Sequence, residues 1–471
     1  MIKSSFLYVF FLVSCLQALS APALAQQQTE EPLSAGKLLN MLETHYPPLQ
    51  ITREKVRQNQ AKLLEKQGAF DLVVKSKAEV AVLGYYQNII LDTEVRQPTT
   101  LWGTDFFMGY RLGRGKIPDY YGGKETLSLG EWRVGMETPL LQNGPIDPRR
   151  ADILLLELDI DASELDILNK QLKFAKSALK AYWSWLTLAQ KERVAEELLE
   201  RAQIKVDQLQ AEVNVGKTAP IYVTENQRSI FKRQQKLLEI QQEQQISQQE
   251  LQLFLPENQQ RWLPPQPATP TPLTCERLNA QPDAQALNSA QERRPETLQL
   301  ALKQRQNQIA QDLALNFQWP TLDLYFELSQ DFGEGSETKE QTELMGGVKF
   351  YYPPALRKAQ GQIQRIESIE RALQFEQRFL RREIAQEIKA LWIERKNSCL
   401  QALLAEQEVE VAKKVAAAER QRFDLGSSTL FTVNLLEEAV AEARLRYLDA
   451  LKNYWLAESL VPISQGLWPQ S

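Results

Sequence analysis

The chain has 471 residues, a formal net charge of −5, one histidine and three cysteines. The negative charge removes the electrostatic attraction on which nucleic-acid binding relies, so no nucleic acid partner is expected. A single histidine, His45, and three cysteines are too few to build a metal centre or a histidine-based catalytic site. The composition therefore predicts a protein that is not an enzyme, with no catalytic residues, metal site or cofactor.

The first 25 residues have the layout of a secretory signal peptide. A basic start precedes an apolar run from Phe6 to Val13, and Ala23-Leu-Ala25 gives the small-x-small pattern of a cleavage site. Cys15 allows a second interpretation, a lipoprotein cleavage box in which this cysteine becomes lipid-modified. No later stretch has the ~18 consecutive apolar residues of a transmembrane helix. The sequence thus predicts export to the periplasm, the outer membrane or the exterior.

The first half of the mature chain, 26–255, changes period twice. Helices are predicted over 38–67, with a break at Tyr46-Pro-Pro48. Between about 72 and 138 the pattern has period two, which predicts strands at 89–95, 101–112 and 127–136 after a first strand from Val73. Residues from about 149 to 255 then read as two long helices that meet at Gly216.

A proline-rich linker and equatorial segment, 256–293, separates this half from the second, 294–462. The second half has a helix to about Phe317, two strands within 320–352 and a helical hairpin over 355–461, and 463–471 form a C-terminal tail. After signal cleavage the remaining thiols would be Cys275 and Cys399, in the linker and in mid-helix. In an oxidising compartment they either pair or stay as free thiols.

The hairpin of the second half shows the organisation most clearly. Apolar residues recur in steps of three and four on both sides of Gly426, which places one apolar stripe on each arm. Glycine can adopt the left-handed conformation that closes a helix, and a Ser/Thr cap starts the next one. Two long antiparallel helices with a tight tip at Gly426 are therefore expected.

The two halves repeat each other. Lys180-Ala-Tyr-Trp183 corresponds to Lys389-Ala-Leu-Trp392, and Gly216 corresponds to Gly426. The predicted fold is mainly α with membrane β, built as a duplicated helix, strand, strand and long helical hairpin unit. One copy would supply about four long strands with unpaired edges, which lipid does not tolerate. Several copies would therefore close a shared barrel, with strands at one end and helices at the other.

At this point the sequence resembles the TolC family of outer membrane efflux channels. The resemblance rests on Asn214-Val-Gly-Lys-Thr-Ala-Pro220 at the first tip and on Arg422-Phe-Asp-Leu-Gly-Ser-Ser-Thr-Leu430 at the second. Arg294-Pro-Glu296, Trp319-Pro320 and Lys180-Ala-Tyr-Trp183 add to it. It covers essentially the whole mature chain, and the order and duplication of these motifs carry it.

The resemblance implies a homotrimer with a twelve-stranded outer membrane β-barrel continuous with a periplasmic α-helical barrel. It implies a passive channel-tunnel of a tripartite efflux or type I secretion system, fed by a periplasmic adaptor (membrane fusion protein) and an inner membrane pump. Its hairpin tips would contact the adaptor and open like an iris. The corresponding residues here are Val215, Gly216, Lys217, Arg422, Leu425, Gly426 and Ser427.

The periplasmic gate is where the chain departs from the family pattern. Members with an acidic gate carry aspartates six and nine residues after the second tip glycine and an arginine two after it; those positions are Thr432, Leu435 and Ser428. These three and Asp424 are the candidate gate residues, with Asp424 or Glu437 as possible substitutes for the missing acids. The segment 89–123 is also longer than a minimal barrel hairpin requires, as extended strands plus a large surface loop would explain.

Two functions of other kinds compete with the channel. A periplasmic adaptor also uses coiled-coil hairpins, but normally has one hairpin inserted in small β domains, whereas this chain has two hairpins and two β segments. A soluble periplasmic coiled-coil scaffold would leave the aromatic, alternating strands unexplained. The channel is therefore the leading hypothesis.

Overall fold

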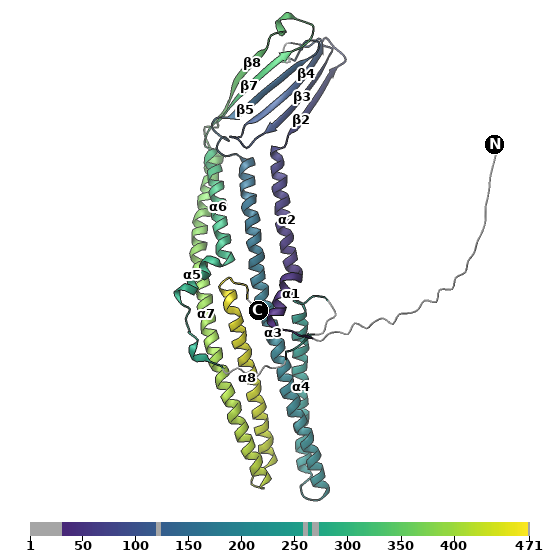
Figure 1. Ribbon diagram of the computed structural model, residues 1–471, viewed down its shortest axis with the longest axis vertical. Helices are drawn as coiled ribbons and strands as arrows, with labels where there is room; N and C mark the ends of the chain where they lie inside the picture. The colour runs from purple at the N-terminus through teal and green to yellow at the C-terminus, as the bar shows by residue number, and fades with distance from the viewer. Residues whose placement is uncertain (1–30, 119–123, 258–261, 266–272, 470–471) are drawn as a thin grey trace, which may run out of the picture.

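The computed structural model describes residues 31–118, 124–257, 262–265 and 273–469. It is a long molecule with a β-sheet at one end and a layer of helices running away from it (Figure 1). The predicted signal peptide and Cys15 lie outside the described residues, as does part of the predicted linker. Within the described ranges, none of the helices has an apolar run sufficient to cross a bilayer.

The elements follow the duplicated order expected from the sequence, except that the first half has four long strands where the second has two. The first half contains α1 Ala35–His45, α2 Pro47–Gln67, β2 Val73–Ala81, β3 Asn88–Pro98, β4 Asp105–Gly115, β5 Glu131–Pro139, α3 Pro148–Asn214 and α4 Ile221–Gln252. The second contains α5 Ala284–Arg293, α6 Pro295–Asn316, β7 Thr321–Asp331, β8 Glu343–Tyr351, α7 Arg357–Asp424 and α8 Leu430–Ser464. Short strands β1 Glu31–Pro32 and β6 Trp262–Leu263 pair in parallel beside the helices.

Two helices run most of the length of the helical layer. α3 has 67 residues and α7 has 68, so each extends roughly 100 Å at a rise of ~1.5 Å per residue. Asp147 caps α3, accepting a hydrogen bond from the Arg150 amide, and Pro148 occupies the first turn, where its missing N–H costs nothing. The predicted mainly helical fold with two long hairpins is confirmed.

The helices form one layer whose members change along its length. Near the sheet the neighbours in order are α2, α3, α6 and α7; toward the far end they are α4, α3, α8 and α7. α3 and α7 therefore belong to both levels, while α2 and α6 are replaced by α4 and α8. The outermost helices are α2 and α7 near the sheet, and α4 and α7 toward the far end.

The sheet has six antiparallel strands in the order β2-β3-β4-β5-β7-β8. The expectation of about four strands per copy is wrong, because residues 88–115 fold as an additional hairpin, β3–β4, between β2 and β5. The alternation in 89–123 is therefore that of two full strands. Residues 119–123, at the end of that segment, lie outside the described residues.

The two faces of this sheet differ sharply in polarity. The strand register places alternate residues on one face, called here the apolar face, whose larger side chains are Val74, Val80, Ile89, Leu91, Val95, Phe106, Met108, Tyr110, Leu112, Trp132, Val134, Met136, Leu322, Leu324, Phe326, Leu328, Leu344, Val348 and Phe350. Among the paired residues of that face, Arg114 is the single charged one. Lys75, Lys77 and Glu79 lie on the face opposite Val74, Ala78 and Val80, as the period-two pattern predicted from Val73 onward requires.

The opposite face, called here the charged face, carries ten acidic and six basic side chains. They are Glu79, Asp92, Glu94, Asp105, Glu131, Glu137, Asp323, Glu327, Asp331 and Glu343, with Lys75, Lys77, Arg96, Arg111, Arg133 and Lys349. Many are joined across strands: Asp92 lies 3.1 Å from Arg111 and 2.5 Å from Arg133. Such a face suits water and not hydrocarbon.

The main core lies at mid-length, where α1, the start of α2, α3 and the end of α4 meet. Trp185, Tyr182, Leu42 and Leu251 are buried together there. The Tyr182 hydroxyl donates a hydrogen bond of 3.0 Å to the Leu33 carbonyl, and burial raises the pKa of Tyr182 to about 12. Ala181, Tyr182 and Trp183 of the Lys180-Ala-Tyr-Trp183 motif thus pack in or against this core.

A disulfide bond joins the equatorial segment to α7. Cys275, in a short 3₁₀ turn (Cys275–Arg277), is bonded to Cys399 in the middle of α7, with Cα atoms 5.7 Å apart. Both residues are buried. Of the two alternatives open from the sequence, the bonded pair is the one adopted.

Candidate functional site

The two hairpin tips share one backbone geometry. Gly216 and Gly426 have φ of +75° and +71°, the left-handed conformation expected of a helix-closing glycine. In both tips the amide after the glycine bonds five residues back, Lys217 to Glu212 and Ser427 to Arg422, which completes a Schellman motif. No atom lies within 4 Å of a Cβ built on either glycine. The glycines are therefore required by conformation and not by crowding.

Each tip presents apolar side chains to solvent at equivalent places. Val215 and Leu425 precede the two glycines and are 77% and 82% exposed. Ile221 and Phe431, each five residues after its glycine, are also exposed. Large apolar groups at the extreme end of an elongated molecule are typical of a contact surface.

The second tip is held by local polar contacts. Glu419 accepts hydrogen bonds from the Ser428 hydroxyl and from Arg422, the latter at 3.0 Å. Thr429 caps α8, accepting from the Thr432 amide. Ser428 and Thr432 are thus engaged within the tip.

The candidate gate residues do not form a single cluster. Asp424 ends α7, and Leu435 lies one turn into α8 with half of its side chain exposed. Glu437, named from the sequence as a possible substitute, occupies a more central position described below.

Just above the tips the two hairpins pack on each other. Leu209 of α3, Val223 of α4 and Leu430 of α8 are buried in one cluster, with Phe423 of α7 at its edge. The Lys205 ammonium lies over the Phe423 ring, 5.0 Å from its centre. Burial, together with the nearby charge of Arg420, lowers the pKa of Lys205.

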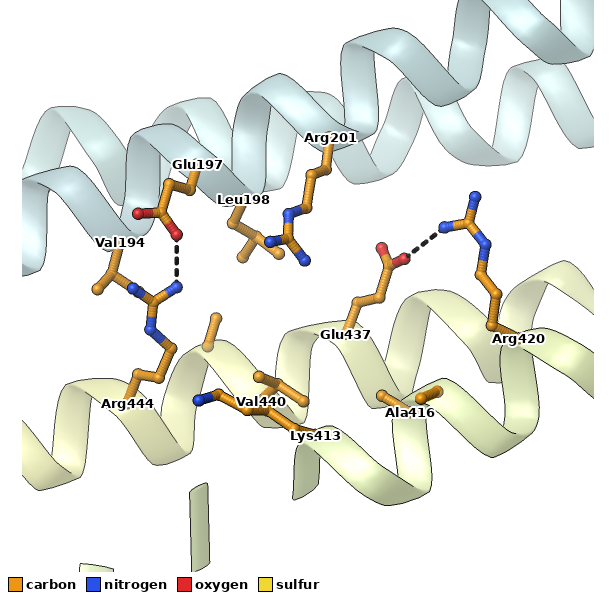
Figure 2. Close-up of a pocket in the computed structure, with 12 residues that line it drawn as sticks. Val194, Glu197, Leu198, Arg201, Lys413, Ala416, Arg420, Glu437, Val440 and Arg444 are labelled. Atoms are coloured by element: carbon orange, nitrogen blue, oxygen red, sulfur yellow. Dashed lines mark hydrogen bonds and ion pairs between the residues drawn. The ribbon is translucent and has the colours of Figure 1, made fainter. Parts of the chain in front are cut away.

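A cleft opens between α3 and the α7–α8 hairpin further along (Figure 2). Glu197 of α3 accepts a hydrogen bond of 2.6 Å from Arg444 of α8 across it, and this bond lowers the pKa of Glu197. Arg420 of α7 lies 3.1 Å from Glu437 of α8, within the second hairpin. Arg201 and Lys413 add positive charge to the same lining.

Glu437 also faces a buried arginine of the first hairpin. Arg233 of α4 is 6% exposed, and its Nη1 donates a 2.9 Å hydrogen bond to the Leu198 carbonyl. Its Nη2 lies 3.7 Å from the Glu437 carboxylate, too far for a hydrogen bond but close enough for strong attraction. Burial lowers the pKa of Arg233.

These contacts belong to a longer series that joins α8 to α3 and α4. We call the series the inter-hairpin row; its members are the pairs Lys191–Asp449, Glu197–Arg444, Lys232–Glu438, Arg233–Glu437 and Asn226–Asn434. The row runs from near mid-length to near the tips, so any separation of the hairpins within one chain must break it.

We compared the chain with known protein families and solved structures. Residues 146–255 match the family model described as outer membrane efflux protein. The helical hairpin α3–α4 is therefore similar to that of outer membrane efflux proteins. No curated protein matches the chain.

Solved structures of outer membrane channels have the same fold. The channel OprN has a TM-score of 0.65 at 12% identity, over 93% of this chain and 91% of that one. CusC has 0.67 at 12%, over 92% of each chain. The Campylobacter jejuni channel CmeC has 0.65 at 12%, over 99% of this chain and 95% of that one. At such identities, these matches establish the fold.

The match over α3 and α4 and the shared fold thus relate this chain to outer membrane efflux proteins. Among the residues described, no group of three or more His, Cys, Asp or Glu side chains is placed to hold a metal ion. The features that bear on function are therefore the apolar face, the charged face and the two hairpins joined by the inter-hairpin row.

Sequence reasoning located the tips but missed most of the inter-hairpin row. Partners such as Glu197 and Arg444 are 247 residues apart, and each sits in a helix rich in Glu, Lys and Arg. Arg233 is one of several basic residues on α4, and only its burial distinguishes it. A covariation signal between the two hairpins could have found these pairs; spacing along one sequence could not.

Proposed function

We propose that this channel is the passive outer membrane component of a tripartite efflux or type I secretion system. Three copies form one conduit, which receives substrate from a periplasmic adaptor and an inner membrane pump and releases it outside. The observation that carries this proposal is the continuity of a sheet having one apolar and one charged face with two long hairpins whose ends present apolar side chains.

The free edges of the sheet and of the helical layer support ring formation. β2 and β8 end the sheet, and α4 and α7 end the helical layer at the far end. The outward side of α7 exposes Ile393, Leu400, Leu404, Val411 and Val415, in alternating steps of seven and four. The outward side of α4 exposes Phe231, Leu238 and Ile246. Such rows pack as a coiled-coil seam when α4 of one copy meets α7 of the next.

The orientation of the sheet follows from its two faces. In a closed barrel the apolar face meets lipid and the charged face lines the lumen, because a face with one charge among its paired residues suits hydrocarbon. Trp132 and Tyr110, in contact on the apolar face with ring centres 5.2 Å apart, suit the membrane interface.

The tips supply the adaptor contact. We assign it to Val215, Gly216 and Lys217 on the first tip and to Arg422, Leu425, Gly426 and Ser427 on the second, with Ile221 and Phe431 beside them. Two equivalent tips per copy would offer an adaptor six similar sites on a ring of three.

Opening then requires the hairpins to separate near these tips. The gate would comprise the inter-hairpin row together with Asp424, Ser428, Thr432 and Leu435 at the second tip. On opening, each side chain in the row would lose its partner and be hydrated instead. The free-energy cost would be small for the exposed pairs and largest for the buried Arg233.

Membrane fractionation followed by gel migration of unheated and heated samples in detergent tests the proposal. A heat-sensitive trimer in the outer membrane fraction is the expected result. A soluble periplasmic monomer, or an inner membrane lipoprotein, would overturn it and favour an adaptor role.

A further inference from the structure

Four helices connect to the sheet, and they connect to four of its six strands. α2 leads to β2, β5 leads to α3, α6 leads to β7 and β8 leads to α7, and the order of these helices matches the order of these strands. β3 and β4 have no helix of their own. They lie between β2 and β5, above the junction of α2 and α3.

This additional hairpin is an integral part of the sheet wall. β3 and β4 pair over eleven residues from Asn88–Gly115 to Pro98–Asp105, and each also pairs along its other edge. The side chains follow the polarity of the neighbouring strands: Leu91 and Met108 on the apolar face, Asp92 and Arg111 on the charged face. A hairpin folded over the sheet as a loop would not continue both faces.

The turn between β3 and β4 is fastened to the helical end of the sheet. The Thr104 and Thr138 hydroxyls are 2.8 Å apart, which joins the turn to β5. Arg150, in the first turn of α3, donates to the carbonyls of Asn143 at 2.6 Å and Thr100 at 3.5 Å. The hairpin therefore spans the full height of the sheet, from the loops at one end to the first turn of α3 at the other.

The width of six strands matches the width of four helices. Strands ~4.8 Å apart and tilted by ~40° each occupy ~6 Å of a barrel's circumference, so six cover about 38 Å. Four helices packed ~9 Å apart cover about 36 Å. Four strands would cover only about 25 Å and would force the wall to narrow where helices pass into strands.

We propose that each copy contributes six strands to the barrel, with β8 of one copy paired to β2 of the next, so that three copies form eighteen strands. This inference rests on the ring of three copies proposed above, and it gives that ring a wider lumen than twelve strands would. The lumen in the membrane is then as wide as the helical tunnel, and barrels of 16–18 strands leave an aqueous channel. The channel suits bulky hydrated cargo.

The two free edges fit each other. β2 and β8 each have nine residues and run in opposite directions, as the strict alternation across six strands requires. Val74 and Val80 at one edge, and Leu344 and Val348 at the other, lie on the same apolar face. An antiparallel β8–β2 contact therefore continues both faces into the next copy. A second copy of this chain is the occupant that satisfies both edges at once.

Disulfide cross-linking of the full-length channel in outer membranes tests the strand order. Single cysteines at Val73, Lys75 or Lys77 of β2 are combined with single cysteines at Met345, Gly347 or Lys349 of β8, and at least one combination should give dimers and trimers of cross-linked chains. The matched control, Lys75→Cys with Arg133→Cys of β5, should not cross-link, because two strands separate the positions. Single-particle images of the unmodified oligomer in detergent should show eighteen strands.

The outcomes separate this inference from the proposed function. An outer membrane trimer with twelve strands, or with the β2–β5 cross-link within one chain, overturns the inference and leaves the channel assignment intact. A twelve-stranded dimer overturns both the eighteen-strand count and the ring of three. Absence of any outer membrane oligomer overturns the inference and the proposed function together.

Discussion

The guanidinium of Arg233 on α4 lies 3.7 Å from the carboxylate of Glu437 on α8, in a position that is almost closed to water. This contact joins the second helices of the two hairpins. Because Glu437 also receives Arg420 at 3.1 Å, a single carboxylate faces one buried and one exposed cation. Loss of that carboxylate should therefore weaken the closed arrangement of the tips more than loss of any other member of the inter-hairpin row.

The first prediction is that Glu437→Gln loosens the gate. Removing one partner of a buried ion pair typically costs about 3–5 kcal/mol, because the remaining charge stays buried. The variant should make cells more sensitive to a bulky antibiotic that the outer membrane normally excludes, at unchanged channel levels. Arg420→Gln serves as the matched control, since its exposed pair contributes at most about 1 kcal/mol. Equal sensitivity of both variants would contradict a special role for Arg233.

The second prediction concerns pH. Hydrogen bonding from Arg444 lowers the pKa of Glu197, so the folded protein favours the ionised carboxylate. This contribution is fully present above the ordinary glutamate pKa of about 4.3 and disappears as the pH falls through the lower folded-state value. Channel conductance should therefore rise on acidification below about pH 4.5. In Glu197→Gln this acid-induced rise in conductance should be missing. If the variant kept the pH profile of the native channel, Glu197 would not be the group responsible.

The third prediction is that Gly426→Val impairs export without preventing membrane insertion. A β-branched residue at φ +71° is strained by roughly 1–2 kcal/mol, which disturbs the tip while the sheet is far away. Export of substrate should fall while the amount of heat-sensitive oligomer stays constant. Gly361→Ala within α7 is the control, because it also has open space around it but an ordinary helical backbone. Normal export by Gly426→Val would count against tip docking.

The fourth prediction is that the channel prefers cations. Ten acidic and six basic side chains share the charged face, and an excess of carboxylates in a pore attracts positive ions. In a planar bilayer with a salt gradient, the reversal potential should have the sign of a cation-selective pore. Replacing Glu327 and Asp331 by their amides should move it toward zero. The same replacements of Glu54 and Glu65, exposed on α2, should leave it unchanged.

The fifth prediction addresses the disulfide. Cys275 and Cys399 are 124 residues apart, and closing a loop of this length restrains the unfolded chain by about 4–5 kcal/mol in the simple entropic treatment. Cys399→Ala should lower the temperature at which tryptophan fluorescence reports unfolding. A reducing agent should have the same effect on the native chain and no further effect on the variant. No change on reduction would show that the bond adds nothing to stability.

The repeated parts of the molecule were predictable from the sequence because their signals are local. A glycine between two runs of helical period, a Ser/Thr cap after it and the paired motifs Lys180-Ala-Tyr-Trp183 and Lys389-Ala-Leu-Trp392 each depend on neighbouring residues only. The same is true of the alternation from Val73 to Ala81, which correctly separated the two faces of β2.

The number of strands and the residue pairs across the helical layer were harder to predict from the sequence. The alternation in β3 and β4 is as regular as in their neighbours, yet period two does not say whether a hairpin enters the sheet or leaves it. Arg233 and Glu437 occur among many charged helical residues, and only the packing of the two hairpins against each other brings them together. The disulfide was likewise undecided, since it depends on bringing a linker turn to the middle of α7.

The β3–β4 insertion has a consequence for how such channels change size. A hairpin adds strands in twos, so the outermost strands β2 and β8 keep opposite directions and the proposed ring can still close. A single added strand would leave parallel edges that do not fit the alternating pattern. Because β3 and β4 have no helices attached, the perimeter in the membrane grows while the periplasmic layer is untouched. If the proposed ring and adaptor contact are correct, pore calibre and adaptor docking can change independently during evolution.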